Sequence, residues 1–195
     1  MLDTVQLNPP AVLKEMAEAT KAIGFTMGSD MQTGSLLRTL AASKPTGTLL
    51  ELGTGTGLGT AWILDGMGPQ TRLISVDRDE RAPAIARKFL GSDPRVTFLT
   101  MDGAQFLSSM RQQGRNFDFI FADTWPGKFK QLEDALALLA PGGFYIIDDL
   151  LFQTSWEEER PRLVHRLIST LEQRQDLRIT KLNWSTGLIV ATKFS

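Results

Sequence analysis

Glycine occupies every second position from Gly53 to Gly59, between two apolar segments. The segment before it, Thr48–Leu52, predicts a buried strand, and the segment after it, Ala61–Leu64, predicts a helix. A glycine-rich loop at such a junction can receive a nucleotide-like ligand on its backbone, because glycine accepts positive φ and has no Cβ to block a close approach. The alternative is a loop that only turns the chain.

The spacing of the glycines narrows the choice of ligand. The dinucleotide pattern G-x-G-x-x-G fails in every frame, since Leu58, Thr60 and Trp62 stand where its third glycine would be. The P-loop pattern G-x-x-x-x-G-K-[ST] is also missing from the sequence. What remains is E-x-G-x-G-x-G, which resembles the first motif of class I S-adenosylmethionine (SAM) methyltransferases, whose ligand has no phosphates. The resemblance implies SAM contacts from six residues of this stretch: Glu51, Gly53, Thr54, Gly55, Gly59 and Thr60.

Acidic residues end the next two predicted strands, on the side where an open α/β sheet binds its ligands. Asp77 follows the glycines by a little over twenty residues, so its carboxylate can accept both ribose hydroxyls; the alternative is a solvated side chain. Asp102 either lies against the adenine, as the resemblance implies, or caps the next helix, and both roles are compatible. Three neighbours of these acids join the predicted SAM site: Arg78, Gly103 and Ala104.

The fourth and fifth predicted strands also end in acids, Asp123 and the pair Asp148 and Asp149, the pair following a Pro-Gly-Gly turn. Here the sequence resembles the catechol and caffeoyl-CoA type of O-methyltransferase. The resemblance implies that these three carboxylates bind Mg²⁺ or Ca²⁺, and that Trp125 lies with Asp123 beside SAM. Adjacent strands are ~4.8 Å apart, so their ends can share a cation. The alternative is that Asp148 and Asp149 only cap a loop.

Two positions depart from that family's pattern. Asp149 stands where the family has asparagine, and Pro126 stands where it has its lysine base. Lys128 comes two residues later, and Gly127 could let the loop return it to the site, so we predict Lys128 as the base and Asp123 as its catalytic partner; the alternative is a surface lysine. His165, the sole histidine, is predicted to be a surface residue on a long helix.

The remaining elements predict an α/β fold. Strands alternate with helices from Thr48 onward, with a helix predicted to begin near Asp79 and the fifth strand predicted at Gly143–Ile147. This alternation predicts a doubly wound, mostly parallel sheet. With a closing hairpin near Leu177–Thr192, the class I methyltransferase fold implies seven strands in the order 3-2-1-4-5-7-6, with the last strand antiparallel. Residues 1–46 are predicted as a helical cap and 47–195 as the core of a single domain. The cap has a helix starting with Asn8 as its N-cap and Pro9 as its first residue, and a second helix near Gly34–Ser43.

The composition limits the domain number, the partners and the location of the protein. The chain of 195 residues suits one domain, and its formal charge of −1 gives no reason to expect nucleic acid or an anionic membrane as partner. Without cysteine, disulfides and thiolate metal sites are excluded. The start, Met1–Thr4, lacks the features of a signal peptide, and no apolar run is long enough to span a membrane, so a cytoplasmic location is predicted.

The predicted function is SAM-dependent O-methylation of a small phenolic or catechol-like acceptor, either with or without the help of a divalent metal. Aromatic residues in the loop Leu151–Trp156 favour a flat or apolar acceptor, unless they pack on the core or on another subunit; homodimers are common in the family that the chain resembles. One alternative is a SAM-binding regulator, or a methyltransferase that needs no metal. Another is a nucleotide-dependent oxidoreductase, which the failed dinucleotide pattern disfavours.

Overall fold

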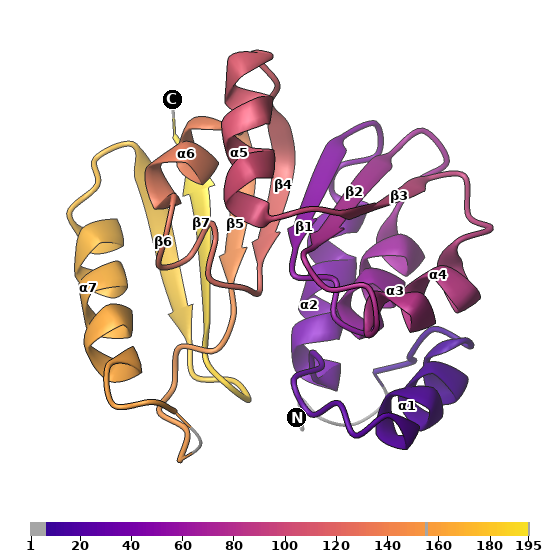
Figure 1. Cartoon of the computed structure of the whole chain (residues 1–195). Coiled ribbons are helices and arrows are strands. Elements are labelled where there is room, and N and C mark those ends of the chain that lie inside the picture. Colours follow the sequence, from indigo (N-terminus) through magenta and orange to yellow (C-terminus); the bar gives the residue numbers. More distant parts are fainter. Residues whose placement is uncertain (1–6, 155, 195) are drawn as a thin grey trace.

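The computed structural model describes residues 7–154 and 156–194, so the expectation about Met1–Thr4 lies outside the described residues. A single seven-stranded sheet runs through the molecule in the order β3-β2-β1-β4-β5-β7-β6, which confirms the predicted order (Figure 1). The strands from β3 to β5 pair in parallel, whereas β7 pairs antiparallel with both β5 and β6. The order reverses between β1 and β4, the point at which open α/β sheets bind ligands.

The elements follow the alternation that the sequence predicts. The strands are β1 (Thr48–Leu52), β2 (Arg72–Asp77), β3 (Val96–Thr100), β4 (Phe117–Ala122), β5 (Leu139–Ile147), β6 (Leu177–Leu182) and β7 (Leu188–Lys193). The helices are α1 (Leu13–Ala22), α2 (Met31–Ala42), α3 (Leu58–Gly66), α4 (Pro83–Leu90), α5 (Gly103–Gln112), α6 (Leu132–Ala137) and α7 (Arg160–Glu172). None of the helices in the described ranges has the length and apolar character needed to cross a membrane.

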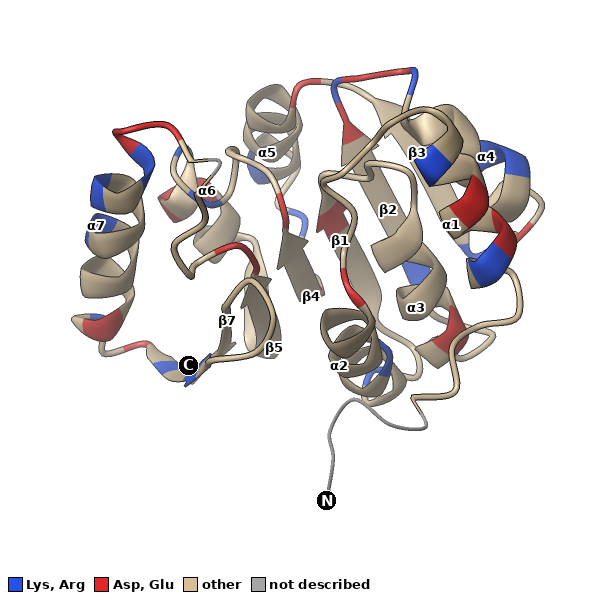
Figure 2. Cartoon of the chain, turned by 90° about the horizontal axis from the view of Figure 1, so that it is seen from below, with Lys and Arg blue, Asp and Glu red and all other residues tan. Residues whose placement is uncertain are grey.

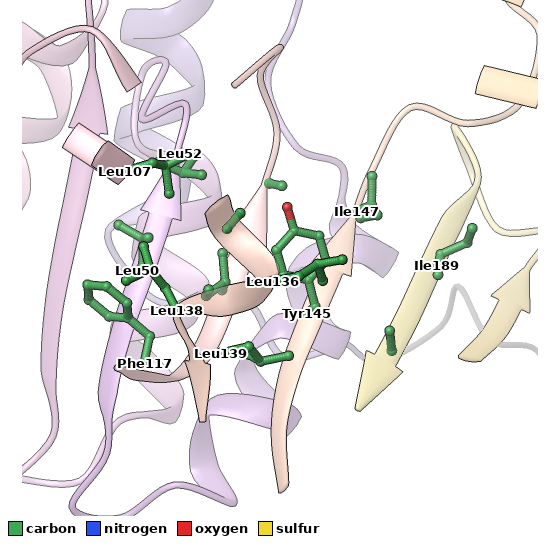
Figure 3. Close-up of a cluster of buried hydrophobic side chains, with 14 of the residues drawn as sticks. Leu50, Leu52, Leu107, Phe117, Leu136, Leu138, Leu139, Tyr145, Ile147 and Ile189 are labelled. Atoms are coloured by element: carbon green, nitrogen blue, oxygen red, sulfur yellow. The ribbon is translucent and has the colours of Figure 1, made fainter. Parts of the chain in front are cut away.

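Successive side chains of a strand point to opposite faces of the sheet. Both faces of this sheet are covered by helices. Leu50 and Leu52 of β1 pack in a cluster with residues of α5, α6 and α7, part of which Figure 3 shows. Leu49, directly before Leu50, points to the opposite face and packs in the second cluster with residues of α1, α2 and α3. The two N-terminal helices therefore contribute to the core of one sheet face.

The first predicted helix start is wrong. Asn8 has a left-handed φ of 47°, and α1 begins only at Leu13, with Val12 as its N-cap residue. The backbone oxygens of Leu7 and Asn8 accept hydrogen bonds from Arg38 of α2 at 2.8 and 2.7 Å. This tertiary contact holds the segment before α1, whereas the local sequence favours a cap at Asn8.

Three other predicted boundaries shift. The second helix begins at Met31 instead of Gly34, because Asp30 accepts hydrogen bonds from the amides of Gln32 and Thr33 and so caps it. The fourth helix, predicted to begin near Asp79, begins after a turn. The fifth strand, predicted from Gly143, extends back to Leu139, which pairs with β4 before a register shift.

Candidate active site

A cavity of about 620 Å³ opens at the carboxyl ends of β1, β2 and β4. The glycine loop lines one part of it, and the segment after β4 lines another. Of the residues predicted for the site, ten line this cavity: Gly53, Thr54, Gly55, Gly59, Asp77, Arg78, Asp123, Trp125, Lys128 and Asp149. Seen from below, acidic segments follow β4 and β5 directly (Figure 2).

The glycine loop requires glycine at two positions for steric reasons. Gly53 has φ of 98°, and a Cβ there would lie 2.7 Å from the backbone oxygen of Asp123. Gly57 has φ of 87°, and a Cβ there would lie 2.6 Å from the Cβ of Ala86. Both conformations are unfavourable for other residues, so the loop packs closely between β4 and α4 and leaves its backbone facing the cavity.

Glu51 lies beneath this loop instead of lining the cavity. It is 1% exposed, and its carboxylate accepts hydrogen bonds from the hydroxyls of Thr60 and Ser75, each at 2.5 Å. Burial raises the pKa of Glu51 to about 7, against the lowering effect of the two hydroxyls, and the nearby charge of Asp77 adds to the rise. Glu51 and Thr60, both predicted as SAM contacts, therefore connect β1 to α3 and β2.

Asp77 connects the end of β2 to the glycine loop. One carboxylate oxygen accepts a hydrogen bond from the amide of Gly55 at 2.9 Å, and the other accepts one from the amide of Asp79 at 3.0 Å. Each oxygen keeps a second lone pair, so the carboxylate can still accept from a ligand hydroxyl. The predicted ribose contact remains a prediction.

Asp102 takes the capping role that the sequence left open. Its carboxylate accepts hydrogen bonds from the amides of Ala104 and Gln105, at 2.9 and 3.1 Å, and caps α5. Within the described part of the chain, Asp102, Gly103 and Ala104 are not among the residues that line the cavity. Their predicted contact with adenine stays a prediction, because the capping role of Asp102 is compatible with it.

Asp148 is buried after β5, whereas Asp123, directly after β4, is half-buried. Desolvation raises the pKa of Asp123 well above its usual range, although the Lys128 ammonium opposes the rise. Burial likewise raises the pKa of Asp148, whose carboxylate accepts hydrogen bonds from the hydroxyl of Thr186 at 2.6 Å and the amide of Asp149 at 2.7 Å. The two acids and Lys128 therefore belong to one electrostatic group.

Lys128 reaches this group through the turn that the sequence suggested. Gly127 has φ of 83°, and the carbonyl of Trp125 accepts hydrogen bonds from the amides of Lys128 and Phe129. The buried hydroxyl of Tyr145 donates to the carbonyl of Gly127 and ties the turn to β5. Lys128 is only 3% exposed, yet it lines the cavity. It is not a surface lysine.

The three predicted metal ligands do not fit a divalent ion. Asp149 has a left-handed φ of 62°, and its carboxylate accepts hydrogen bonds from Gln153 at 3.1 Å and from Arg160 at 3.1 Å. The Arg160 guanidinium is thus bound to the carboxylate that would have to be the third metal ligand. Among residues 7–154 and 156–194, no group of three acidic or histidine side chains has a geometry suited to a metal.

Sequence reasoning missed several residues that line the cavity. Arg160 comes from the start of α7, and Phe25, Met27 and Ser29 come from the connection between α1 and α2. Of these residues, only Arg160 could have been suspected from the sequence. It is a cation at the first residue of a helix, where the helix dipole disfavours positive charge. His165 lies exposed on α7, beside a separate groove that Arg162 and Arg166 also line.

Comparison with known proteins places this arrangement in a family. A family model described as a methyltransferase domain matches residues 50–150, which include the glycine loop and all the acidic strand ends. The chain belongs to this methyltransferase family. Among its relatives, the catechol O-methyltransferase of Niastella koreensis is 29% identical over 123 residues, 60% of this chain and 56% of that protein. The catechol O-methyltransferase of Mycobacterium tuberculosis is 25% identical over 146 residues, 73% of this chain and 66% of that protein.

The chain spans about half the length of the curated relatives it matches. Solved structures cover it more fully. The O-methyltransferase of Bacillus cereus in complex with SAH has a TM-score of 0.84 at 22% identity, covering 97% of this chain and 93% of that one. The O-methyltransferase TomG of Streptomyces achromogenes in complex with SAM has a TM-score of 0.86 at 20% identity, covering 99% and 94%. At these identities the likeness shows that this methyltransferase shares their fold.

Proposed function

We propose that this methyltransferase transfers a methyl group from SAM to a hydroxyl of a small, flat acceptor. One observation carries the proposal: the same cavity joins the glycine loop and Asp77 to the half-buried Asp123 and the buried Lys128. A donor site and a polar pair suited to handling a proton thus share one space. Relatives named catechol O-methyltransferase and neighbours solved with SAM or SAH support it.

The donor end fits the chemistry of SAM. Its sulfonium supplies an electrophilic methyl group, and it carries no phosphate that would need a lysine or an anion-binding loop. The backbone of Gly53–Gly59 offers a surface without side chains, and Asp77 offers acceptors for ribose hydroxyls. Leu58 and Ala82 add apolar lining at this end.

At the acceptor end we assign two tasks. Trp125 and Phe129, whose rings meet edge to face at 5.6 Å, line the cavity and favour a flat acceptor. We assign Asp123 and Lys128 to take the hydroxyl proton as the acceptor oxygen bonds to the methyl carbon and the carbon–sulfur bond breaks. Alignment of the oxygen with the methyl group would supply much of the rate.

The test begins with binding. Calorimetry with SAM should show about tenfold or greater weakening in Asp77→Ala, because hydrogen bonds to a charged group contribute about 1.5–3 kcal/mol. Glu80→Ala removes the same charge three residues away, outside the cavity lining, and should bind as the wild type does. Equal affinity in wild type and a folded Asp77→Ala variant would refute the assignment of Asp77.

Mass spectrometry with SAM and a panel of phenols, catechols and aliphatic alcohols then tests transfer. Product methylation together with release of S-adenosylhomocysteine is expected for a phenolic acceptor. SAM binding without transfer to any acceptor would favour a SAM-binding regulator instead.

A further inference from the structure

The carboxylate of Asp149 is already neutralised by the chain itself. Its Oδ1 accepts a hydrogen bond from Gln153 Nε2, and its Oδ2 is paired with an Arg160 guanidinium nitrogen at 3.1 Å. Both side chains are partly shielded from water, with 23% and 31% of the side-chain surface of Arg160 and Asp149 exposed. An ion pair in such surroundings is screened less than a pair on the open surface.

Arg160 is held in this position by more than one contact. Its guanidinium carbon lies 4.8 Å from the centre of the Trp156 ring, and Trp156 in turn meets Phe152 edge to face. It is also the first residue of α7, where the positive end of the helix dipole disfavours a cation. The Asp149 carboxylate offsets that cost, so the pairing accounts for a charge that the helix alone would not favour.

A second cation of the chain lies near the other two acids. Lys128 is buried in the cavity wall close enough to Asp123 and Asp148 to act on both electrostatically. The three carboxylates thus face two fixed positive charges, both of which line the cavity. A divalent ion entering between the acids would be repelled by both cations.

We propose that Arg160 and Lys128 replace a divalent metal in this enzyme, with Arg160 occupying the third carboxylate and so excluding the ion. Arg160 is then a positioning residue: it fixes Asp149 and the loop before α7, while Lys128 faces the acceptor oxygen. Methyl transfer is expected to be independent of added metal. This proposal rests on the methyltransferase function proposed above.

The decisive experiment measures Mn²⁺ binding directly, by the electron paramagnetic resonance signal of the free ion and by the melting temperature. The wild type should neither deplete the free ion nor melt higher with excess Mn²⁺, and EDTA should not change its melting temperature. Arg160→Met frees Asp149 and removes the repelling charge, so its Mn²⁺ affinity should rise by about tenfold or more, with a higher melting temperature.

Two further variants make the result specific. Arg160→Lys keeps the charge, so it should neither bind Mn²⁺ nor melt higher in its presence. Arg162→Met removes an exposed arginine of the same helix and should behave as the wild type does.

A wild-type Mn²⁺ response that Asp148→Asn removes would overturn the proposal. A folded Arg160→Met protein that still ignores Mn²⁺ would overturn it as well. Each protein is also melted with SAM. If SAM fails to stabilise the wild type, the methyltransferase function is refuted, while the Mn²⁺ comparison still decides the role of Arg160.

Discussion

Replacing Glu51 with glutamine should make the protein's stability less dependent on pH. The carboxyl group is fully buried beneath the glycine loop and accepts hydrogen bonds from Thr60 and Ser75. Glutamine has the same shape as the protonated acid, and its amide oxygen can accept both hydroxyl hydrogen bonds. The variant therefore removes the ionisation and keeps the packing.

The magnitude follows from the pKa of Glu51, which burial raises from 4.5 to about 7. Between these values the folded state binds the proton that the unfolded state has lost, so the free energy of unfolding falls as pH rises. The slope is about 1.4 kcal/mol per pH unit, and the full loss is about 3 kcal/mol. This contribution is complete below pH 4.5 and is lost above pH 7.

Urea unfolding of wild type and Glu51→Gln from pH 5 to pH 8.5 measures the effect. The free energy of unfolding of the variant minus that of the wild type should increase by about 2–3 kcal/mol over this range. Other acids with raised pKa values, such as Asp148, contribute to both proteins and cancel in the difference. A difference that stays constant with pH would refute the buried ionisation of Glu51.

Three further substitutions test the loops of the site. Gly53→Ala should cost about 1–3 kcal/mol of stability and weaken SAM binding, since the added Cβ would meet the Asp123 carbonyl. As a control, Gly142→Ala is also at positive φ but has nothing within 4 Å of the added Cβ, so calorimetry should show unchanged SAM binding. Asp102→Ala should cost about 1 kcal/mol in thermal or urea unfolding through the lost cap of α5. An accompanying loss of SAM affinity would support the predicted adenine contact, and unchanged affinity would refute it. Tyr145→Phe leaves the Gly127 carbonyl without its donor, so the free energy of unfolding should fall by about 1–3 kcal/mol. The turn that carries Lys128 would shift, so kcat should fall as well. An unchanged kcat would show that this turn has no part in catalysis.

The fold was predictable because its signals are local and repeated. Apolar runs such as Thr48–Leu52 are buried strands, and the β–α alternation leaves few topologies once right-handed crossovers are required. The errors lie at helix starts, where tertiary contacts decide. Arg38 bonds the carbonyls of Leu7 and Asn8, and no local pattern around Asn8 announces that partner.

The candidate site was predictable where it depends on strand ends. Asp77 and Asp123 follow their strands directly, and parallel strands bring their carboxyl ends to one edge. Lys128 was found only because Gly127 allows a tight turn. The pairing of Asp149 with Arg160 could not be read from the sequence, since it joins the start of a helix to a residue in left-handed conformation eleven positions earlier.

The place of β1 in the sheet has a consequence for synthesis on the ribosome. β1 pairs on one side with β2, which follows it closely in the chain, and on the other side with β4, which is made only after β3 and α5. Until Ala122 has emerged, one edge of β1 remains open and Leu50 and Leu52 lack the strand beside them. Unpaired apolar edges of this kind promote aggregation. A chain that stalls between β3 and β4 would therefore be a substrate for chaperones, whereas one that stalls after β4 would already have its central strand enclosed.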